Sequence, residues 1–424
     1  MTDTDWPIHP LWSLVTEIRE AVDPASLGSR VVHYSIPLVD TTGTGQAEAT
    51  ELIKSAKLRL RGGEVLISKL NPRKSRVLIV TEDSLPIVSS TEFVGLHPSN
   101  RLDSRFLAYW LQAESTRQTL DSQVQSVTRS HQRVAPEDIT HLSLRLPPIV
   151  QQRHIADFLD SETALIDKLV QLRERQLELW AERTHAFTYR HVTDPSGTPD
   201  VNQYISWLGP ISKGWTAPAI GRVARFIMGT TFPHTYQGKT SGDFPFIKVG
   251  DFKSADVIGR ISSAENWIDA EDARALGARI VPAGAVLYAR VGAALLLNRR
   301  CITTCPSVID DNVRAITFSH GDPRYWAGVL SLLDMGQLAN PGPVPSVSES
   351  QVSPIRVPDP GAVAQQLIAE RLERNLLQWD RARSLVKSQI ALLAERRQAL
   401  ITAAVTGQFD VSTAGGRNVT DGVQ

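Results

Sequence analysis

Three residues in the second half of the chain have the types and spacing of a metal-dependent nuclease site. Asp243 is followed by Asp251, and Lys253 stands two residues further on. In such a site two carboxylates hold Mg²⁺ and a lysine polarises the attacking water. The template is loose, and the corresponding place in the first half, Asp40-Thr-Thr, has no lysine. A nuclease that acts alone through these residues is therefore an alternative interpretation.

Other catalytic motifs are missing from the sequence. It contains neither a phosphate-binding loop ending in Gly-Lys-Ser/Thr nor a dinucleotide-binding fingerprint. An amino-methyltransferase needs an Asn/Asp-Pro-Pro-aromatic loop, and the chain has Asn71-Pro-Arg and Asn340-Pro-Gly instead. Cys301 and Cys305 form a lone pair, whereas a zinc site needs about four ligands. The sequence signals for an enzyme are therefore weak.

Basic side chains gather in loops that two predicted strands would present to a ligand. Eight Lys and Arg fall within residues 54–76, with Glu64 as the single acid, and the loop 69–76 follows a predicted strand. The corresponding loop in the second half comes after Arg290 and carries Arg299 and Arg300. A solvated surface is one interpretation, and contact with phosphates or base edges of DNA is the other.

Charge and loop position select the candidate DNA contacts. A second basic loop carries Arg129 and Arg133, although its counterpart 346–350 has no basic residue. The complete set of candidates is Lys69, Arg73, Lys74, Arg76, Arg129, Arg133, Lys248, Lys253, Arg290, Arg299 and Arg300.

Composition places the chain among ordinary globular proteins. Its 424 residues include 45 basic and 45 acidic side chains, with 42 % hydrophobic and 21 % charged residues. This length predicts about two to four domains. Two cysteines fit a reducing compartment, so we expect a cytoplasmic protein. The N-terminus lacks the features of a secretory signal, and no apolar run approaches the ~20 residues of a membrane helix.

The elements that position these residues occur twice. Residues 181–193 align with 394–406 at an offset of 213, which also places Gln152 on Gln365 without a gap. Upstream, residues 63–69 match 284–290. A duplicated unit, in which a globular segment precedes a long helix, explains this order.

Each copy ends in a predicted long helix. Residues 152–192 contain no Gly or Pro, and apolar residues recur at steps of three and four in both copies. This spacing is typical of a coiled-coil seam, and each helix would be roughly 60 Å long. Gln176 and Gln389 set the register of the seam or are simply half-exposed. We expect an antiparallel pair with pseudo-twofold symmetry.

The globular segments predict an α/β (α+β) fold. Strands are expected at 31–36, 64–68, 76–81, 144–147, 246–249, 286–289, 315–318 and 355–358, and helices at 104–114 and 325–333. The predicted domains are a globular domain at 1–150, a helix at 151–193, a linker at 194–204, a second globular domain at 205–360, a helix at 361–408 and a disordered tail at 409–424.

The sequence resembles the specificity subunits of type I restriction–modification systems over nearly its whole length. The resemblance is carried by residues 146–160, 395–408 and 67–73, and by Trp207-Leu-Gly-Pro-Ile with Trp215. One departure is the entry to the second helix, where 357–360 lacks the Pro-Pro pair and only Gln365-Gln366 remains of the Gln-Gln-Arg.

This resemblance implies a division of labour between subunits. The two target-recognition domains would each read one half of a split double-stranded DNA target, and the helices would act as a spacer. The helices would also dock two methyltransferase subunits, which use S-adenosylmethionine. Two restriction/translocase subunits would supply ATP- and Mg-dependent functions, and this chain would hold no cofactor. A protein–protein adaptor without a role on DNA is the third interpretation.

Overall fold

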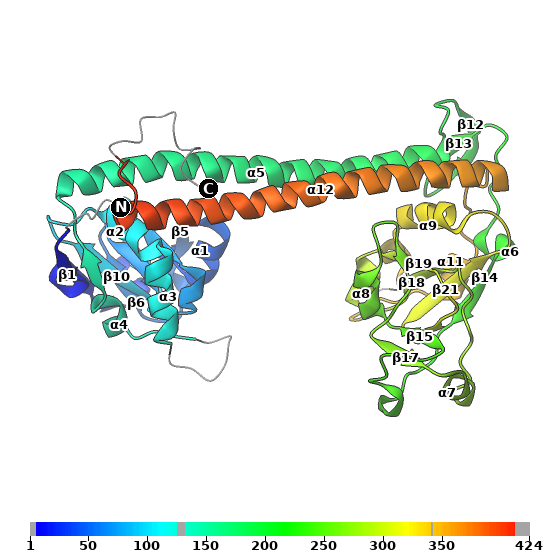
Figure 1. Ribbon diagram of the computed structural model, residues 1–424, viewed down its shortest axis with the longest axis horizontal. Helices are drawn as coiled ribbons and strands as arrows, with labels where there is room; N and C mark the ends of the chain where they lie inside the picture. Colours follow the sequence, from blue (N-terminus) through cyan, green and yellow to red (C-terminus); the bar gives the residue numbers. More distant parts are fainter. Residues whose placement is uncertain (1–5, 125–131, 341, 412–424) are drawn as a thin grey trace. The chain divides into compact units, whose positions relative to one another are not determined.

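The chain forms two compact units, described in a computed structural model over residues 6–124, 132–340 and 342–411 (Figure 1). Unit 1 comprises Met1–Leu172 with Ser388–Gln424, and unit 2 comprises Arg173–Lys387. Both long helices cross the boundary, so each unit contains one part of each helix. Within the described residues, no helix is both long and apolar enough to span a membrane.

Unit 1 is built on two larger sheets, beside the two-stranded sheet β1-β11. One has four antiparallel strands in the order β2-β10-β7-β8, and the other has the order β3-β6-β9-β4-β5, in which β4 and β9 are parallel. The strands are β1 (Ile8–Pro10), β2 (Val15–Ile18), β3 (Ala21–Val22), β4 (Arg30–Tyr34), β5 (Gln46–Ala49), β6 (Lys57–Leu60), β7 (Val65–Ser68), β8 (Val77–Ile79), β9 (Ile87–Ser89), β10 (Phe93–Pro98) and β11 (Ser143–Arg145). The short helices are α1 (Ile36–Thr42), α2 (Ser104–Gln112), α3 (Glu114–Ser122) and α4 (Pro136–Thr140).

Unit 2 repeats this plan. Its larger sheet has the order β14-β21-β18-β19-β16, and a second sheet has the order β17-β15-β20, in which β15 and β20 are parallel. The strands are β12 (Pro199–Ile205), β13 (Gly209–Ser212), β14 (Ala224–Met228), β15 (Phe244–Ile247), β16 (Arg260–Ile261), β17 (Asn266–Ile268), β18 (Val286–Ala289), β19 (Arg300–Thr303), β20 (Val308–Ile309) and β21 (Val313–Phe318). The short helices are α6 (Ile220–Val223), α7 (Ala270–Ala275), α8 (Ala293–Leu296), α9 (Pro323–Leu332), α10 (Met335–Leu338) and α11 (Glu349–Val352).

The repeat predicted from the sequence is confirmed in the order of the elements. β7 and β18 come from the two matched segments, and each has two antiparallel neighbours in its sheet. One neighbour is the next strand of the chain, β8 or β19, and the other is a later strand that precedes a helix, β10 or β21. That helix is α2 in unit 1 and α9 in unit 2, and both begin after an aspartate cap. The expected α+β architecture is correct, while the pseudo-twofold relation stays a prediction.

The long helices are α5 (Ile149–Thr193) and α12 (Ala362–Val405), each about 66 Å long at 1.5 Å per residue. Neither contains Gly or Pro, and Gly407 adopts the left-handed conformation (φ 76°) just beyond the end of α12. In unit 1 Arg397 donates to Asp167 across the pair at 3.0 Å. In unit 2 the rings of Phe187 and Trp379 meet edge to face at 5.3 Å. The start of each helix therefore packs against the end of the other, as an antiparallel pair requires.

Each helix end belongs to the hydrophobic core of its unit. In unit 1 Ile155 and Leu159 of α5 and Ile401 of α12 are buried with Phe106 and Leu107 of α2. In unit 2 the corresponding core combines α9 with Val192, Ile368 and Leu372. The globular part of each unit is thus packed directly onto the helices, and burial of these side chains stabilises the attachment.

Three local predictions were wrong. Residues 199–204 of the expected linker belong to strand β12, because they pair with β13 after the tight turn at Gly209 (φ 99°). The strand expected at 355–358 is reduced to an isolated bridge at Arg356. Phe409, at the start of the expected disordered tail, is ordered, because its ring packs 5.7 Å from that of Phe158. Residues 412–424 lie outside the described part of the chain.

Candidate nucleic-acid interface

The basic loop of unit 1 is a rigid turn between β7 and β8. Pro72–Lys74 forms one turn of 3-10 helix, flanked by Asn71 (φ 52°) and Ser75 (φ 46°) in the left-handed region. Such backbone conformations cost free energy in residues other than glycine and persist only where the surroundings impose them. Arg73 and Lys74 are exposed on this turn, so the loop presents both cations on a fixed frame.

Arg76 holds this loop in place. Its Nε and Nη2 donate to the Asp40 carboxylate at 2.5 and 2.8 Å, and its Nη1 donates to the Leu70 carbonyl at 3.1 Å. The side chain is only 7 % exposed. The Arg76 hydrogen bonds also hold the pKa of Asp40 below its usual value. Arg76 therefore acts inside the chain to position Arg73 and Lys74.

The structure brings the two predicted basic loops of unit 1 together. Leu70 forms a β-bridge with Arg133, and the Val134 N–H donates to the Lys69 carbonyl at 3.1 Å. Arg133 forms two hydrogen bonds with Glu92, at 3.1 and 2.9 Å. Its charge is therefore already paired. Arg129 lies outside the described residues.

Unit 2 has the same junction with different side chains. Val291 bridges to Ser346, and the Val347 N–H donates to the Arg290 carbonyl at 2.9 Å, as Val134 does to Lys69 in unit 1. Alignment of the repeats had already paired these loops, so this prediction is confirmed. Ser346 takes the place of Arg133, which leaves this edge of unit 2 without that cation.

Arg299 and Arg300 are adjacent in sequence but differ in environment. Arg299 is exposed after the left-handed Asn298 (φ 52°), whereas Arg300 Nη2 donates to Asn298 Oδ1 at 2.8 Å and to the Leu333 carbonyl at 3.0 Å. Burial lowers the pKa of Arg300 to about 10. Of this pair, only Arg299 presents its guanidinium on the surface.

Two further candidates lie beside the second sheet of unit 2. Lys248 Nζ stands 4.9 Å from the centre of the Phe232 ring, a cation–π contact. Lys253 is exposed on the 3-10 turn Val249–Ser254. Both side chains carry charge at the surface of unit 2, and their contact with DNA stays a prediction.

The nuclease alternative is not supported, because its carboxylates serve the backbone. Asp251 is buried and accepts hydrogen bonds from the N–H groups of Lys248 (2.7 Å) and Glu265 (3.0 Å). Asp243 accepts from the N–H of Ala270 at 2.8 Å, at the start of α7. Among the described residues, no group of three His, Cys, Asp or Glu is arranged to hold a metal ion.

The globular part of each unit is attached to its long helix by an equivalent buried glutamine. The Asp103 N–H donates to Gln152 Oε1 at 2.8 Å, and the Asp322 N–H donates to Gln365 Oε1 at 3.1 Å. Neither glutamine has any exposed surface. The offset of 213 had aligned them, and their equivalence is confirmed.

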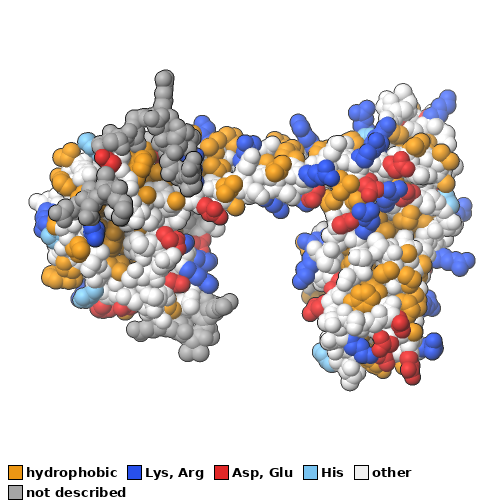
Figure 2. Space-filling view, in the orientation of Figure 1, with side chains coloured by type: hydrophobic (Ala, Val, Ile, Leu, Met, Phe, Trp, Pro, Cys, Tyr) orange, Lys and Arg blue, Asp and Glu red, His pale blue; other side chains and the backbone are white. Residues whose placement is uncertain are grey.

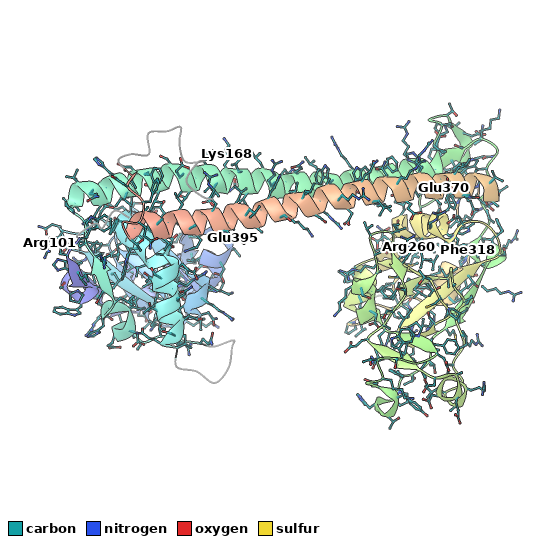
Figure 3. The ribbon with its side chains drawn as sticks, viewed as in Figure 1. Arg101, Lys168, Arg260, Phe318, Glu370 and Glu395 are labelled. Carbon is teal, nitrogen blue, oxygen red and sulfur yellow. The ribbon has the colours of Figure 1, made fainter. Side chains whose placement is uncertain are left out.

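An arginine after each capping aspartate makes a second attachment, which sequence reasoning missed. Arg105 Nη1 donates to Asp157 and Asp160 of α5 at 2.7 and 2.8 Å, and Arg324 pairs with Glu373 of α12. Arg260, labelled in Figure 3, also donates to Glu373 at 3.2 Å. The offset of 213 places Asp160 on Glu373, so the repeat itself held the signal.

The exposed charges of the two units are mixed in sign. Figure 2 shows Lys and Arg interspersed with Asp and Glu over the visible face of unit 2. With 45 basic and 45 acidic residues in the chain, selective contacts at the loops are more consistent with this surface than a broad basic patch.

Comparison with known proteins points to one family. The model of the type I restriction modification DNA specificity domain matches residues 34–179. A protein of Methanocaldococcus jannaschii, described as the specificity subunit of the type I restriction enzyme MjaX, is 22 % identical over 258 residues. That match covers 58 % of this chain and 59 % of the relative's length.

Solved structures share the fold over almost the whole chain. A chain from a study of complex assembly and conformational transition in the type I R-M system superposes with a TM-score of 0.74 at 17 % identity, covering 95 % of this chain and 98 % of that one. The HsdS subunit from Thermoanaerobacter tengcongensis gives a TM-score of 0.51 at 16 % identity, with 96 % and 98 % covered.

Proposed function

We propose that this chain, whose residues 34–179 form a type I restriction modification DNA specificity domain, is the sequence-specificity subunit of a type I restriction–modification complex. Each unit reads one half of a split double-stranded DNA target through its recognition domain, and the two helices joining them act as a spacer. The observation that carries the proposal is the repetition of one sheet, one loop junction and one helix attachment in both units.

The chain itself catalyses nothing on this proposal. Asp243 and Asp251 are both engaged by backbone N–H groups. S-adenosylmethionine, ATP and Mg would belong to the partner subunits, and this chain would supply recognition alone. With Arg133 set aside because its charge is paired, the predicted candidates that stand exposed on loops and turns are Arg73 and Lys74 of unit 1 and Lys253 and Arg299 of unit 2.

The long helices offer the surface on which partners would dock. Leu165, Leu172 and Leu179 of α5 are 55 %, 58 % and 42 % exposed and are spaced by seven residues. On α12, Leu385 and Leu392 are 67 % and 62 % exposed at the same spacing. Hydrophobic side chains are visible along the outside of the helices in Figure 2. A leucine stripe at heptad spacing that the chain does not cover fits helices of the two methyltransferase subunits, to which two restriction/translocase subunits would be added.

The decisive test is methylation-aware sequencing of the host genome with and without this gene. Loss of one split adenine-methylated motif on deletion is the expected result, since no other chain would direct the methyltransferase to that motif. Retention of every motif by a host whose methyltransferase subunits are produced would favour the adaptor alternative.

A domain exchange tests the division between the two units. Replacing residues 1–150 by those of a relative should change one half of the methylated motif and leave the other half and the spacer unchanged. A change in both halves would contradict the modular assignment.

A further inference from the structure

Unit 2 carries a row of basic residues on the inner face of its larger sheet. Tyr288 of β18 lies directly opposite Arg314 of β21 on one side and opposite Arg300 of β19 on the other. Directly opposed residues project from the same face of a sheet. Arg290 follows Tyr288 by two residues and continues that face beyond the end of β18.

One carbonyl oxygen holds two of these arginines together. Arg290 Nε and Arg314 Nη1 each donate to the Asp311 carbonyl at 3.0 Å, and Arg314 Nη1 also donates to the Val313 carbonyl at 3.0 Å. Within the described chain, no acceptor binds Nη1 or Nη2 of Arg290, or Nε or Nη2 of Arg314. Several donors of this fixed pair are therefore available to a ligand.

Two more donors beneath the pair are buried and have no partner. Tyr288 is fully buried, and neither its hydroxyl nor Nε of Arg300 meets a hydrogen-bond partner in the part of the chain that the structure describes. Burial raises the pKa of Tyr288 to about 12, and the nearby Arg314, Arg300 and Arg290 act in the opposite direction. The hydroxyl therefore keeps its proton at neutral pH, and it adds a buried polar group beside the two arginines.

The positive charge is not neutralised by close carboxylates. Across residues 6–124, 132–340 and 342–411, no carboxylate oxygen lies within the 4.0 Å ion-pair distance of Arg290, Arg300 or Arg314. Burial, followed by the charge of Arg290, lowers the pKa of Arg314. Two cations that repel one another in a half-buried position are stabilised by an anion between them.

The acids that face this cluster are engaged or remote. The Asp310 and Asp311 carboxylates both accept from the Asn312 side-chain amide, at 2.8 and 3.0 Å. Glu349, at the start of α11, and Asp334, which acts on Arg300, are exposed side chains. The acids of the turn 310–312 thus lower the net positive charge of the site but accept no hydrogen bond from its arginine side chains through their carboxylates.

Unit 1 shows that the fold does not require these charges. Its corresponding row is Val94, Ile67 and Val77, paired in the same register, and Lys69 stands where unit 2 has Arg290. The backbone bond at this position is shared, since the Lys69 N–H donates to the Glu92 carbonyl at 2.8 Å and the Arg290 N–H donates to the Asn312 carbonyl at 2.9 Å. Burying arginines without ion partners costs free energy that aliphatic residues do not cost.

We propose that Arg290 and Arg314 bind one phosphate of the DNA backbone, and that this site exists in unit 2 alone. The proposal rests on the proposed DNA-reading function and names a contact within it. Guanidinium groups pair with phosphate oxygens through parallel N–H donors. A phosphate fixed here sets the register of the second half-site and adds no information on the bases.

The test combines a protein variant with a neutral phosphate. The assembled complex binds target duplexes in which single phosphates are replaced by methylphosphonate, one position at a time. Arg314→Val installs the residue that unit 1 has, and Arg290→Lys keeps a charge at the other position. For wild type, neutralising one phosphate in the second half-site should weaken binding about tenfold, in the range of charge-assisted hydrogen bonds. The same duplex should cost the Arg314→Val complex nothing further.

Other readouts separate the possible outcomes. Arg314→Val should lower the slope of log affinity against log salt by about 0.9, the value for one phosphate, and leave the methylated motif unchanged. Arg299→Ala is the control, since neutralising the same phosphate should still weaken the binding of the Arg299→Ala complex. If Arg314→Val accepted other bases at one position of the motif, the arginines would be assigned to base recognition and the proposal would be overturned. It would also be overturned if no phosphate of the second half-site lost its effect on binding in the Arg314→Val complex.

Two controls distinguish failure of this inference from failure of the proposed function. If the wild-type complex shows no preference for a split target, the specificity role itself fails. If it does and Arg314→Val behaves as wild type on every duplex, only the phosphate site fails. Inorganic phosphate should raise the melting temperature of wild type no more than that of Arg314→Val, and a selective rise would assign the site to free phosphate.

Discussion

Replacement of Gln152 by alanine should loosen the recognition domain of unit 1 from its helix. The Gln152 side chain is fully buried and makes three hydrogen bonds. Its Oε1 accepts from the Asp103 N–H at 2.8 Å, and its Nε2 donates to the carbonyls of Arg101 (2.9 Å) and Pro147 (2.8 Å). The amide thus joins the start of α5 to the cap of α2, and alanine leaves one donor and two acceptors without partners.

The cost follows from those three bonds. Each is worth about 1 kcal/mol net, and a buried group left unpaired costs about 1–3 kcal/mol, so a loss of about 3 kcal/mol is the lower end of the expectation. For a unit of this size about 2–4 °C is lost per kcal/mol. The melting temperature of unit 1 should therefore fall by about 6–12 °C.

Calorimetry measures the fall in melting temperature. Hydrogen exchange of peptides from β7 in unit 1 and β18 in unit 2 then shows which unit has lost stability. The control is Gln151→Ala at the half-buried neighbour, whose amide makes no hydrogen bond with the described residues; its effect should stay within about 0.5 kcal/mol. Gln365→Ala should destabilise unit 2 less than Gln152→Ala does unit 1, because Gln365 makes two bonds, to Asp322 and Asp359. Equal effects of Gln151→Ala and Gln152→Ala would refute the reasoning.

Three further predictions concern ion pairs and caps. Arg76 lowers the pKa of Asp40, so the stability that this carboxylate contributes is present above its unfolded pKa, about 4, and is lost as the pH falls through the lower folded value. Asp40→Asn should therefore make the stability of unit 1 less dependent on pH at the acid end of a circular-dichroism titration. An unchanged pH dependence would exclude the ion pair as its source. Asp251→Asn should destabilise unit 2 by about 1–2 kcal/mol and leave target methylation intact, whereas loss of Mg²⁺-dependent cleavage at full stability would revive the nuclease. Arg324→Ala should remove the bond from α9 to Glu373, which then keeps the one from Arg260, and speed hydrogen exchange of α9 but not of α2; equal acceleration of both helices would contradict a local attachment.

Period and repetition in the sequence were enough to predict most of the scaffold. The strand at 286–289 is confirmed to the residue, and the two long helices are confirmed within a few residues of their ends. These elements are specified locally, by runs without Gly or Pro and by apolar spacing. The strand β12 was missed because its Pro, Asp and Asn residues are typical of a linker, and only pairing with β13 makes it a strand.

The candidate site was harder to predict because the charge of a residue does not tell whether its side chain points into solvent or into the protein. Arg76 and Arg300 share the basic loops with Arg73 and Arg299, yet both turn inward. The groups that draw them in are distant in sequence: Asp40 lies 36 residues from Arg76, and the Leu333 carbonyl lies 33 residues from Arg300. Arg314 was missed for the opposite reason, since it stands in an apolar strand with no other charge beside it.

The duplicated scaffold separates residues that attach a domain from residues that distinguish it. Gln152 and Gln365 occupy equivalent places and do the same work, and so do the capping aspartates that bond to them. The row of residues across the sheet at Ile67 of β7 is aliphatic, whereas the row at Tyr288 of β18 carries arginines. A transplanted domain 1–150 leaves Gln152 behind in the host helix. The chimera should therefore keep this attachment with any incoming residue except proline at position 103, because the bond to Gln152 uses the backbone N–H of that residue.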